Sequence, residues 1–211
     1  MSKQNGGIIG PNNIPTGAFG SASGVWKLSD AINYKRQGTW PVVLNNFQID
    51  NSCRFNDGSS DYLSKTFSSA SSSNTTFTVS TWVKRSKLGA NQDVVSAYQS
   101  SSGKQTDLIR FGSGDDLEFY AHTTNSSGNA DIKTNRVFRD VGAWYHIVVR
   151  VDTTQGTASN RVRIYVNGVQ ETSFSTSNYM NQNGTIVWGL GSGVVHTIGA
   201  VGTSNYFVGY V

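Results

Sequence analysis

Cysteine, proline, glutamate and charge are all scarce in this chain of 211 residues. The single cysteine, Cys53, excludes an intrachain disulfide. Charged residues make up 14% of the sequence, against roughly 25% in ordinary soluble domains. The chain has only two glutamates, Glu118 and Glu171, and strong helix formers are few. These shortages disfavour a domain built mainly from helices.

Small turn-forming residues take the place of the missing charges. Glycine, serine, threonine and asparagine are abundant, and they supply positive φ angles and local hydrogen bonds between side chain and backbone. Hydrophobic residues make up 36% of the chain and aromatic residues 11%, enough for a hydrophobic core. The composition therefore predicts an all-β domain of short strands joined by many turns.

The net charge of +4 is unevenly distributed. Residues 1–45 carry four basic side chains and one acidic one, whereas the remaining 13 basic and 12 acidic residues nearly cancel. Nucleic-acid-binding proteins concentrate more positive charge on one face, so we expect no nucleic-acid partner. We also expect no membrane insertion and no secretory signal, because no apolar run is long enough, and hence synthesis in a cytoplasm.

The first part of the chain, residues 1–44, differs in amino-acid composition from the rest. Isolated apolar residues stand among glycine, proline, asparagine and serine, and such a segment cannot bury enough surface to offset its ordering entropy. We expect an extended arm that docks on another protein through Ile8, Ile9, Pro11, Ile14, Trp26 and Trp40. A short helix is predicted near 29–37, with Ser29 as its N-cap.

From about residue 45 onward, apolar and polar residues alternate. In the segment 77–85, Phe77, Val79 and Val83 share one face and Trp82 lies on the other. Further strand-like runs cover 93–98, 107–111, 116–122, 130–138, 194–201 and 205–211. Short strands at this spacing predict a two-sheet antiparallel jelly-roll sandwich over residues 45–211.

The segment "WYHIVVRVDTTQGTASNRVRIYVNGV", residues 144–169, contains two such runs. The first run places Ile147 and Val149 on one face, and Trp144 and His146 on the other. The second run ends at Asn167 and Gly168, a strong signal for a two-residue hairpin turn. We interpret the segment as wall of the sandwich, with one polar side.

Residues with catalytic or metal-binding chemistry are dispersed. The alternating carboxylates of glucanases with this kind of fold are missing, and Asp116 and Glu118 are interpreted as the solvated acidic side of a strand after a turn. The segment 57–61 is interpreted as a turn rather than a calcium loop. The three histidines are far apart in the sequence. We expect no enzymatic activity, no metal and no cofactor.

The segment 178–193 is the remaining candidate for a binding site. Tyr179 and Trp188 lie there among asparagine and glycine, and they either stack on a glycan or pack against the core or a neighbouring subunit. We favour packing, which predicts that Trp188→Ala lowers stability and leaves glycan binding intact.

Three of these strands together resemble a known family. Residues 77–85, 144–152 and 162–170 are similar to the laminin-G-like, concanavalin A-like jelly roll. The resemblance covers about residues 45–211. It implies a two-sheet sandwich that binds carbohydrate or protein at its sheet faces or loop rims.

The order of "GIIGP", "SASGVW", "CRFNDGSSDYLSKTF" and "STWVKRS" is also similar to virion and tail-fibre-type proteins of marine bacteriophages. That resemblance implies a phage structural protein, made in the host cytoplasm and located on the virion exterior or tail. The arm would anchor it to other virion proteins, and the jelly roll would serve as spacer or host-surface adhesion module. A trimer is expected by analogy.

Two other functions stay open: a carbohydrate-binding module at a cell surface and, less favoured, a glycan-cleaving enzyme. In similar proteins the last strand continues past "GYV" and pairs with the first strand, here near 50–56. We therefore expect Val211 to be the end of a fragment, truncated within its closing strand, since a half-formed strand leaves an exposed edge.

Overall fold

The computed structural model describes Ile32, Arg36 and residues 52–99, 105–122, 129–189 and 193–211. Ile32 and Arg36 are helical and fall within the predicted helix at 29–37. The predicted arm contacts Ile8, Ile9, Pro11, Ile14, Trp26 and Trp40 lie outside the described residues. No helix in the described part of the chain is long and apolar enough to cross a membrane.

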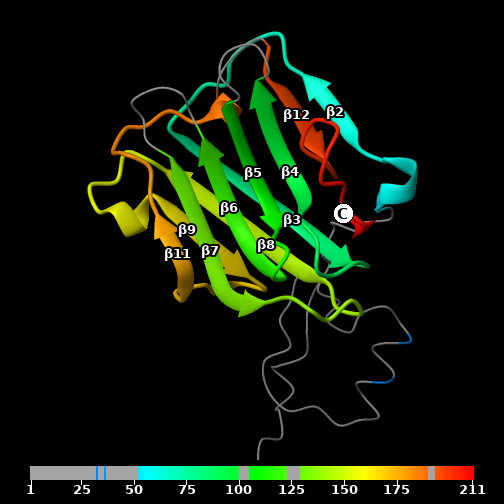
Figure 1. The fold of residues 1–211 in the computed structure, drawn as a ribbon. Coiled ribbons are helices and arrows are strands. Elements are labelled where there is room, and N and C mark those ends of the chain that lie inside the picture. Colours follow the sequence, from blue (N-terminus) through cyan, green and yellow to red (C-terminus); the bar gives the residue numbers. More distant parts are fainter. Residues whose placement is uncertain (1–31, 33–35, 37–51, 100–104, 123–128, 190–192) are drawn as a thin grey trace, which may run out of the picture. The chain divides into compact units, whose positions relative to one another are not determined.

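Two antiparallel sheets face each other in residues 52–211 (Figure 1). The six-stranded sheet has the order β1 (Arg54–Phe55), β13 (Gly209–Tyr210), β3 (Thr76–Arg85), β8 (Tyr145–Asp152), β9 (Val162–Val166), β10 (Val169–Gln170). The seven-stranded sheet has the order β11 (Phe174–Asn178), β7 (Ala130–Val137), β6 (Asp116–His122), β5 (Gln105–Phe111), β4 (Gln92–Gln99), β12 (Val195–Ile198), β2 (Leu63–Thr66). The predicted all-β, two-sheet antiparallel sandwich is confirmed.

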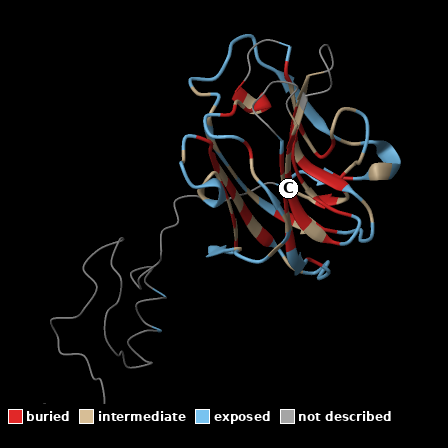
Figure 2. Cartoon of the chain, turned by 60° about the vertical axis from the view of Figure 1, so that its left-hand side comes forward, coloured by how far each residue is buried: buried red, intermediate tan, exposed pale blue. Residues whose placement is uncertain are grey.

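The hydrophobic core lies between the two sheets, where buried residues alternate with outward-facing ones along the strands (Figure 2). The six-stranded sheet contributes Val83, Ile147, Val149 and Ile164 among others. The seven-stranded sheet contributes Ile109, Phe111, Leu117, Phe119 and Ile132. Burying each of these side chains contributes roughly 1.5–3 kcal/mol to stability.

The segment 144–169 forms β8, β9 and the hairpin to β10, so its interpretation as sandwich wall is confirmed. Asn167 and Gly168 both have positive φ angles, 51° and 80°, as a two-residue type I′ turn requires. The side-chain oxygen of Asn167 also accepts a hydrogen bond from the backbone N–H of His146 at 2.8 Å.

The last strands are shorter than predicted. Runs at 194–201 and 205–211 form only β12 and β13. Gly199 ends β12 because it turns the chain with a φ of 90°, and a Cβ there would lie 2.6 Å from the Phe55 ring. β13 pairs with β1 through Arg54 and Tyr210, as predicted, and it also pairs with β3.

A buried ion pair joins the two sheets, and alternation did not predict it. Arg85 at the end of β3 has no exposed surface, and its guanidinium lies 3.1 Å from Asp115 in the β5–β6 turn. It also donates to the carbonyl of Phe138 at 2.7 Å and lies 4.4 Å from the centre of the Phe111 ring. These contacts compensate the burial of the charge.

Candidate functional site

Trp188 lies in a 3₁₀ turn, η4 (Val187–Gly189), at one end of the sandwich. Its backbone N–H donates to Oδ2 of Asp107 on β5 at 3.0 Å. A Cβ at Gly189 would lie 2.4 Å from Cα of Asn74, so only glycine allows this close approach. The buried carboxylate and the tight contact together fix the position of Trp188.

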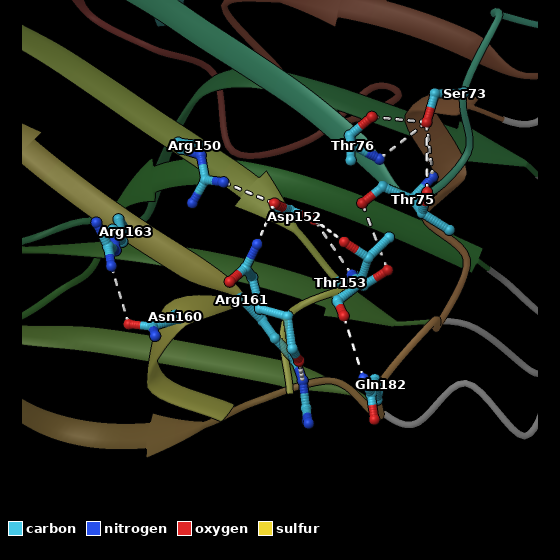
Figure 3. A network of polar contacts seen from close by, with 12 residues as sticks. Ser73, Thr75, Thr76, Arg150, Asp152, Thr153, Asn160, Arg161, Arg163 and Gln182 are labelled. Carbon is cyan, nitrogen blue, oxygen red and sulfur yellow. Dashed lines mark hydrogen bonds and ion pairs between the residues drawn. The ribbon is translucent and has the colours of Figure 1, made fainter. Parts of the chain in front are cut away.

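Hydroxyl side chains just before β3 and just after β8, those of Ser73 and Thr153, hold the neighbouring loops (Figure 3). The Ser73 hydroxyl accepts the backbone N–H groups of Thr75 and Thr76 at 3.2 and 3.1 Å. The Thr153 hydroxyl donates to the carbonyl of Gly184 at 2.7 Å. These bonds tie the β2–β3 loop and the segment before η4 to the sandwich.

The Trp188 ring packs partly on the core. Its centre lies 4.5 Å from that of Phe77, edge to face, and 6.4 Å from that of Phe119, in a stacked arrangement. Aromatic pairs at these distances are stabilising beyond the area they bury. Trp188 is therefore rigidly supported from the core side.

Trp188 also lines a pocket of about 300 Å³. The pocket is lined by Phe67, Ser69, Ala70, Ser71, Trp188 and His196. Phe67, which is half exposed, meets the His196 ring edge to face at 5.0 Å. Residues from the β2–β3 loop, η4 and β12 thus form one aromatic pocket, here called the end pocket.

The described residues that line the end pocket carry no formal charge at neutral pH. Partial burial lowers the pKa of His196, so its imidazole is neutral. Two serine hydroxyls supply the remaining side-chain polarity. Below the pocket, burial raises the pKa of Asp107 to about 7, although the N–H groups of Trp188 and Val187 lower it. The pocket therefore suits an uncharged ligand that has both an apolar face and hydroxyl groups.

Tyr179, the other predicted site residue, is not part of the end pocket. It packs against the core and lines a separate groove of about 500 Å³ together with Gln170, Glu171 and Phe174. The structure therefore places Tyr179 and Trp188 in two different depressions, and it does not bring them together as one sugar-stacking patch.

Phe67 and His196 were missed as site residues by the sequence analysis. Phe67 is far from Trp188 in the sequence, His196 follows Trp188 by eight residues but belongs to the next strand, and neither stands in a recognisable motif. Their meeting depends on β12 pairing with β2, through His196 opposite Lys65. The contact between Phe67 and His196 can be predicted only when the order of the strands in the sheet is known.

The acidic cluster near β6 differs from its predicted solvated state. Glu118 is buried and binds Arg110 through two hydrogen bonds of 2.7 and 3.1 Å, with Lys133 at 3.6 Å. Asp93 on β4 is also buried, and burial raises its pKa to about 7 against the opposing effect of Arg110. The side chain of Glu118 is covered by Arg110 and Lys133, and their positive charges compensate the burial of its negative charge.

The segment 57–61 forms a turn around η2 (Asp57–Ser59), in which the Asn56 side chain accepts the N–H of Gly58 at 3.0 Å. The prediction of a turn is confirmed. Across the described ranges, no group of three or more histidine, cysteine, aspartate or glutamate side chains is arranged to hold a metal ion.

Two solved structures show how the chain compares with known proteins. A heptameric SAP-like pentraxin from Limulus polyphemus is similar over 71% of this chain and 65% of its own, with 18% identity and a TM-score of 0.46. The CBM40 of the Ruminococcus gnavus IT-sialidase, bound to α2,3-sialyllactose, is similar over 71% of this chain and 88% of its own, with 12% identity and a TM-score of 0.49.

No curated protein sequence matches the chain. A family model does: the match covers residues 57–211, from η2 to the last residue of the sequence, and so includes every strand of the sandwich except β1. The chain belongs to the concanavalin A-like lectin/glucanases superfamily.

Proposed function

We propose that the sandwich is a carbohydrate-binding module that recognises an uncharged sugar in the end pocket. The observation that carries the proposal is an aromatic pocket formed by Phe67, Trp188 and His196, in which none of the described lining residues is charged. Aromatic faces bind the apolar faces of pyranose rings, while hydroxyl and imidazole groups bind sugar hydroxyls. Membership of a superfamily of lectins and glucanases supports this ligand class.

The size of the pocket limits the ligand. Its volume of about 300 Å³ is at the lower end of the roughly 300–1,000 Å³ of small-molecule sites. It holds one or two sugar units, so the module recognises the end of a glycan rather than a long internal stretch.

The positions of the carboxylates support the proposal of binding without cleavage. Most glycoside hydrolases use two carboxyl groups that flank the scissile bond. Among the residues described, those that line the end pocket include no carboxylate. Glu118 is buried and bound by Arg110, and Asp93 is buried as well.

A glycan array probed with the full chain tests the proposal. We expect binding to glycans that end in a neutral sugar, and no release of reducing ends from the bound glycans. An array on which neutral glycans give no signal would overturn the assignment of the end pocket. Hydrolysis of a bound glycan would replace the binding module by an enzyme.

We further propose that the sandwich acts as the adhesion part of a bacteriophage virion protein and that residues 1–44 attach it to the particle. The support is the resemblance of the arm and first strands to virion proteins, together with the isolated apolar residues of the arm, Ile8 and Ile9 among them. Co-sedimentation with particles lacking this protein, with and without residues 1–44, tests it. We expect the full chain to sediment with the particles and the chain without residues 1–44 to stay in the supernatant.

The trimer expected by analogy belongs to this second proposal. Light scattering on the purified full chain measures its mass directly. A mass equal to three chains would support a fibre-like assembly, whereas the mass of a single chain would remove that support.

A further inference from the structure

The outward side of the six-stranded sheet presents aromatic rings to solvent. Trp82 on β3 is 47% exposed and Trp144, just before β8, is 40% exposed. Trp82 stacks on His146 at 4.9 Å between ring centres, and Trp144 lies 6.2 Å from Tyr210 on β13. Exposed aromatic side chains gathered on one face are typical of a binding site, whereas single exposed apolar side chains are common on any surface.

Cross-strand pairing places positive charges around these rings. Arg54, Tyr210 and Lys84 are directly opposite one another on β1, β13 and β3, and so they share the outward face. Further along the same face, Thr78, Arg150 and Arg163 form a second row on β3, β8 and β9. The two rows are separated by six residues of β3, about 20 Å.

Negative charge is nearly missing from the outward side of the described strands of this sheet. Asp152 is the one carboxylate, and it is already bound by Arg150 at 2.6 Å, by Gln155 at 2.7 Å and by the Thr154 hydroxyl at 2.6 Å (Figure 3). Arg54 and Lys84 form no ion pair with any described residue. Their charges are therefore available to a ligand.

We infer that this surface, here called the basic aromatic face, binds an acidic polysaccharide, a chain of sugars that carry sulfate or carboxylate groups. The rings of Trp82 and Trp144 stack on pyranose units. Arg54 and Lys84 bind the acidic groups as charge-assisted partners. The hydroxyl of Thr78, in the second row, and that of Ser80, between the two rows, bind sugar hydroxyls.

Charge argues against three other occupants. A second copy of the same face, or the N-terminal residues 1–45 with their net charge of +3, would bring positive charge against positive charge. A nucleic acid carries a phosphate about every 3.4 Å along each strand, which calls for a denser array of cations than two rows about 20 Å apart. A more sparsely charged sugar chain fits this spacing.

The inference concerns a second site and does not depend on the end pocket. Phe67, Trp188 and His196 are not among the residues of the basic aromatic face. A variant that loses one activity and keeps the other therefore separates the two proposals.

The test compares dextran sulfate, polygalacturonate, uncharged dextran and single-stranded DNA as ligands of the full chain at low and high salt. We expect binding to the two acidic polysaccharides that weakens with salt, and no binding to dextran. The double variant Arg54→Gln, Lys84→Gln and the single variant Trp82→Ala should each weaken binding at least tenfold.

The matched control is Lys65→Gln, Lys87→Gln, which removes two exposed charges outside this face and should change affinity by less than twofold. Equal binding of dextran and dextran sulfate, or variants that bind as the wild type does, would overturn the inference. Tighter binding of DNA than of either polysaccharide at the same salt would also overturn it and assign the face to nucleic acid.

Discussion

Among the single residues, Trp188 connects the hydrophobic core with the end pocket. Its ring packs against Phe77 and Phe119, and the same residue lines the pocket. From the sequence, packing and glycan contact are alternatives. The structure makes them compatible, because a side chain at the end of a sandwich has a core side and a solvent side.

Replacing Trp188 with alanine should therefore have two effects. We expect a loss of about 2 kcal/mol of unfolding free energy, less than for a fully buried tryptophan. We also expect at least tenfold weaker binding of the neutral sugar selected on the array. Urea unfolding and calorimetric titration measure the two quantities, and Trp82→Ala serves as control. A less stable variant with unchanged sugar affinity would support packing alone.

Asp107 makes stability depend on pH in an unusual direction. Its pKa is about 7 in the folded protein, because of burial, and 3.8 ordinarily. Between these values the folded state holds a proton that the unfolded state has lost. Unfolding free energy should therefore fall as pH rises from about 4 to 7, by at most about 1.4 kcal/mol per pH unit for this group.

The variant Asp107→Asn tests this dependence, because an amide resembles the protonated carboxyl. We expect Asp107→Asn to raise the melting temperature at pH 8, leave it nearly unchanged at pH 5, and flatten the pH profile. Burial also raises the pKa of Asp93 to about 7, so part of the pH dependence of stability should remain in the variant. A wild-type protein that becomes more stable from pH 5 to pH 8 would contradict the account.

At the scale of elements, the β9–β10 hairpin gives a clean test of turn geometry. Gly168 has a φ of 80°, and a Cβ there would meet no atom within 4 Å. Gly168→Ala should therefore cost about 1 kcal/mol, from backbone strain alone. Gly156→Ala is the matched control, since it also has open space and no positive φ, and it should be neutral. Equal melting temperatures for both variants would refute the strain argument.

Strand faces were predictable from the sequence because alternation fixes them. Alternation predicts that Trp82 and Phe77 point to opposite faces of their strand, and that Trp144 and His146 point to the face opposite that of Ile147, and the structure agrees. What alternation could not give is whether another element covers the outward side. In the described part of the chain Trp82 and Trp144 stay exposed, so a wall of the sandwich also carries a candidate binding surface.

At the scale of the whole molecule, Arg85 and Asp115 join the two sheets in the interior. Asn in place of Asp115 would leave the Arg85 guanidinium buried without its counter-ion. We expect Asp115→Asn to lower unfolding free energy by about 3–5 kcal/mol. Asp57→Asn, which breaks the exposed pair with Lys87, should change it little. Denaturant titration compares them, and equal effects would show that the buried pair is not structural.

The fold was predictable from composition and periodicity, whereas the end pocket was not. The pocket needs Phe67 from the β2–β3 loop to meet Trp188 and His196, which lie more than 100 residues later in the sequence. The Arg85–Asp115 pair was hidden for the same reason. Local pattern fixes which face a residue takes, but long-range strand order decides which residues meet.

The most direct test of the carbohydrate-binding account is the affinity of the full chain, Phe67→Ala and Leu63→Ala for the neutral glycan selected on the array. Phe67 and Leu63 are about equally exposed, at 50% and 51%, and both belong to the β2 region, but only Phe67 lines the pocket. We predict that Phe67→Ala binds at least tenfold more weakly and that Leu63→Ala binds as the wild type does. Equal affinity of all three proteins would contradict the assignment of the end pocket as the sugar site.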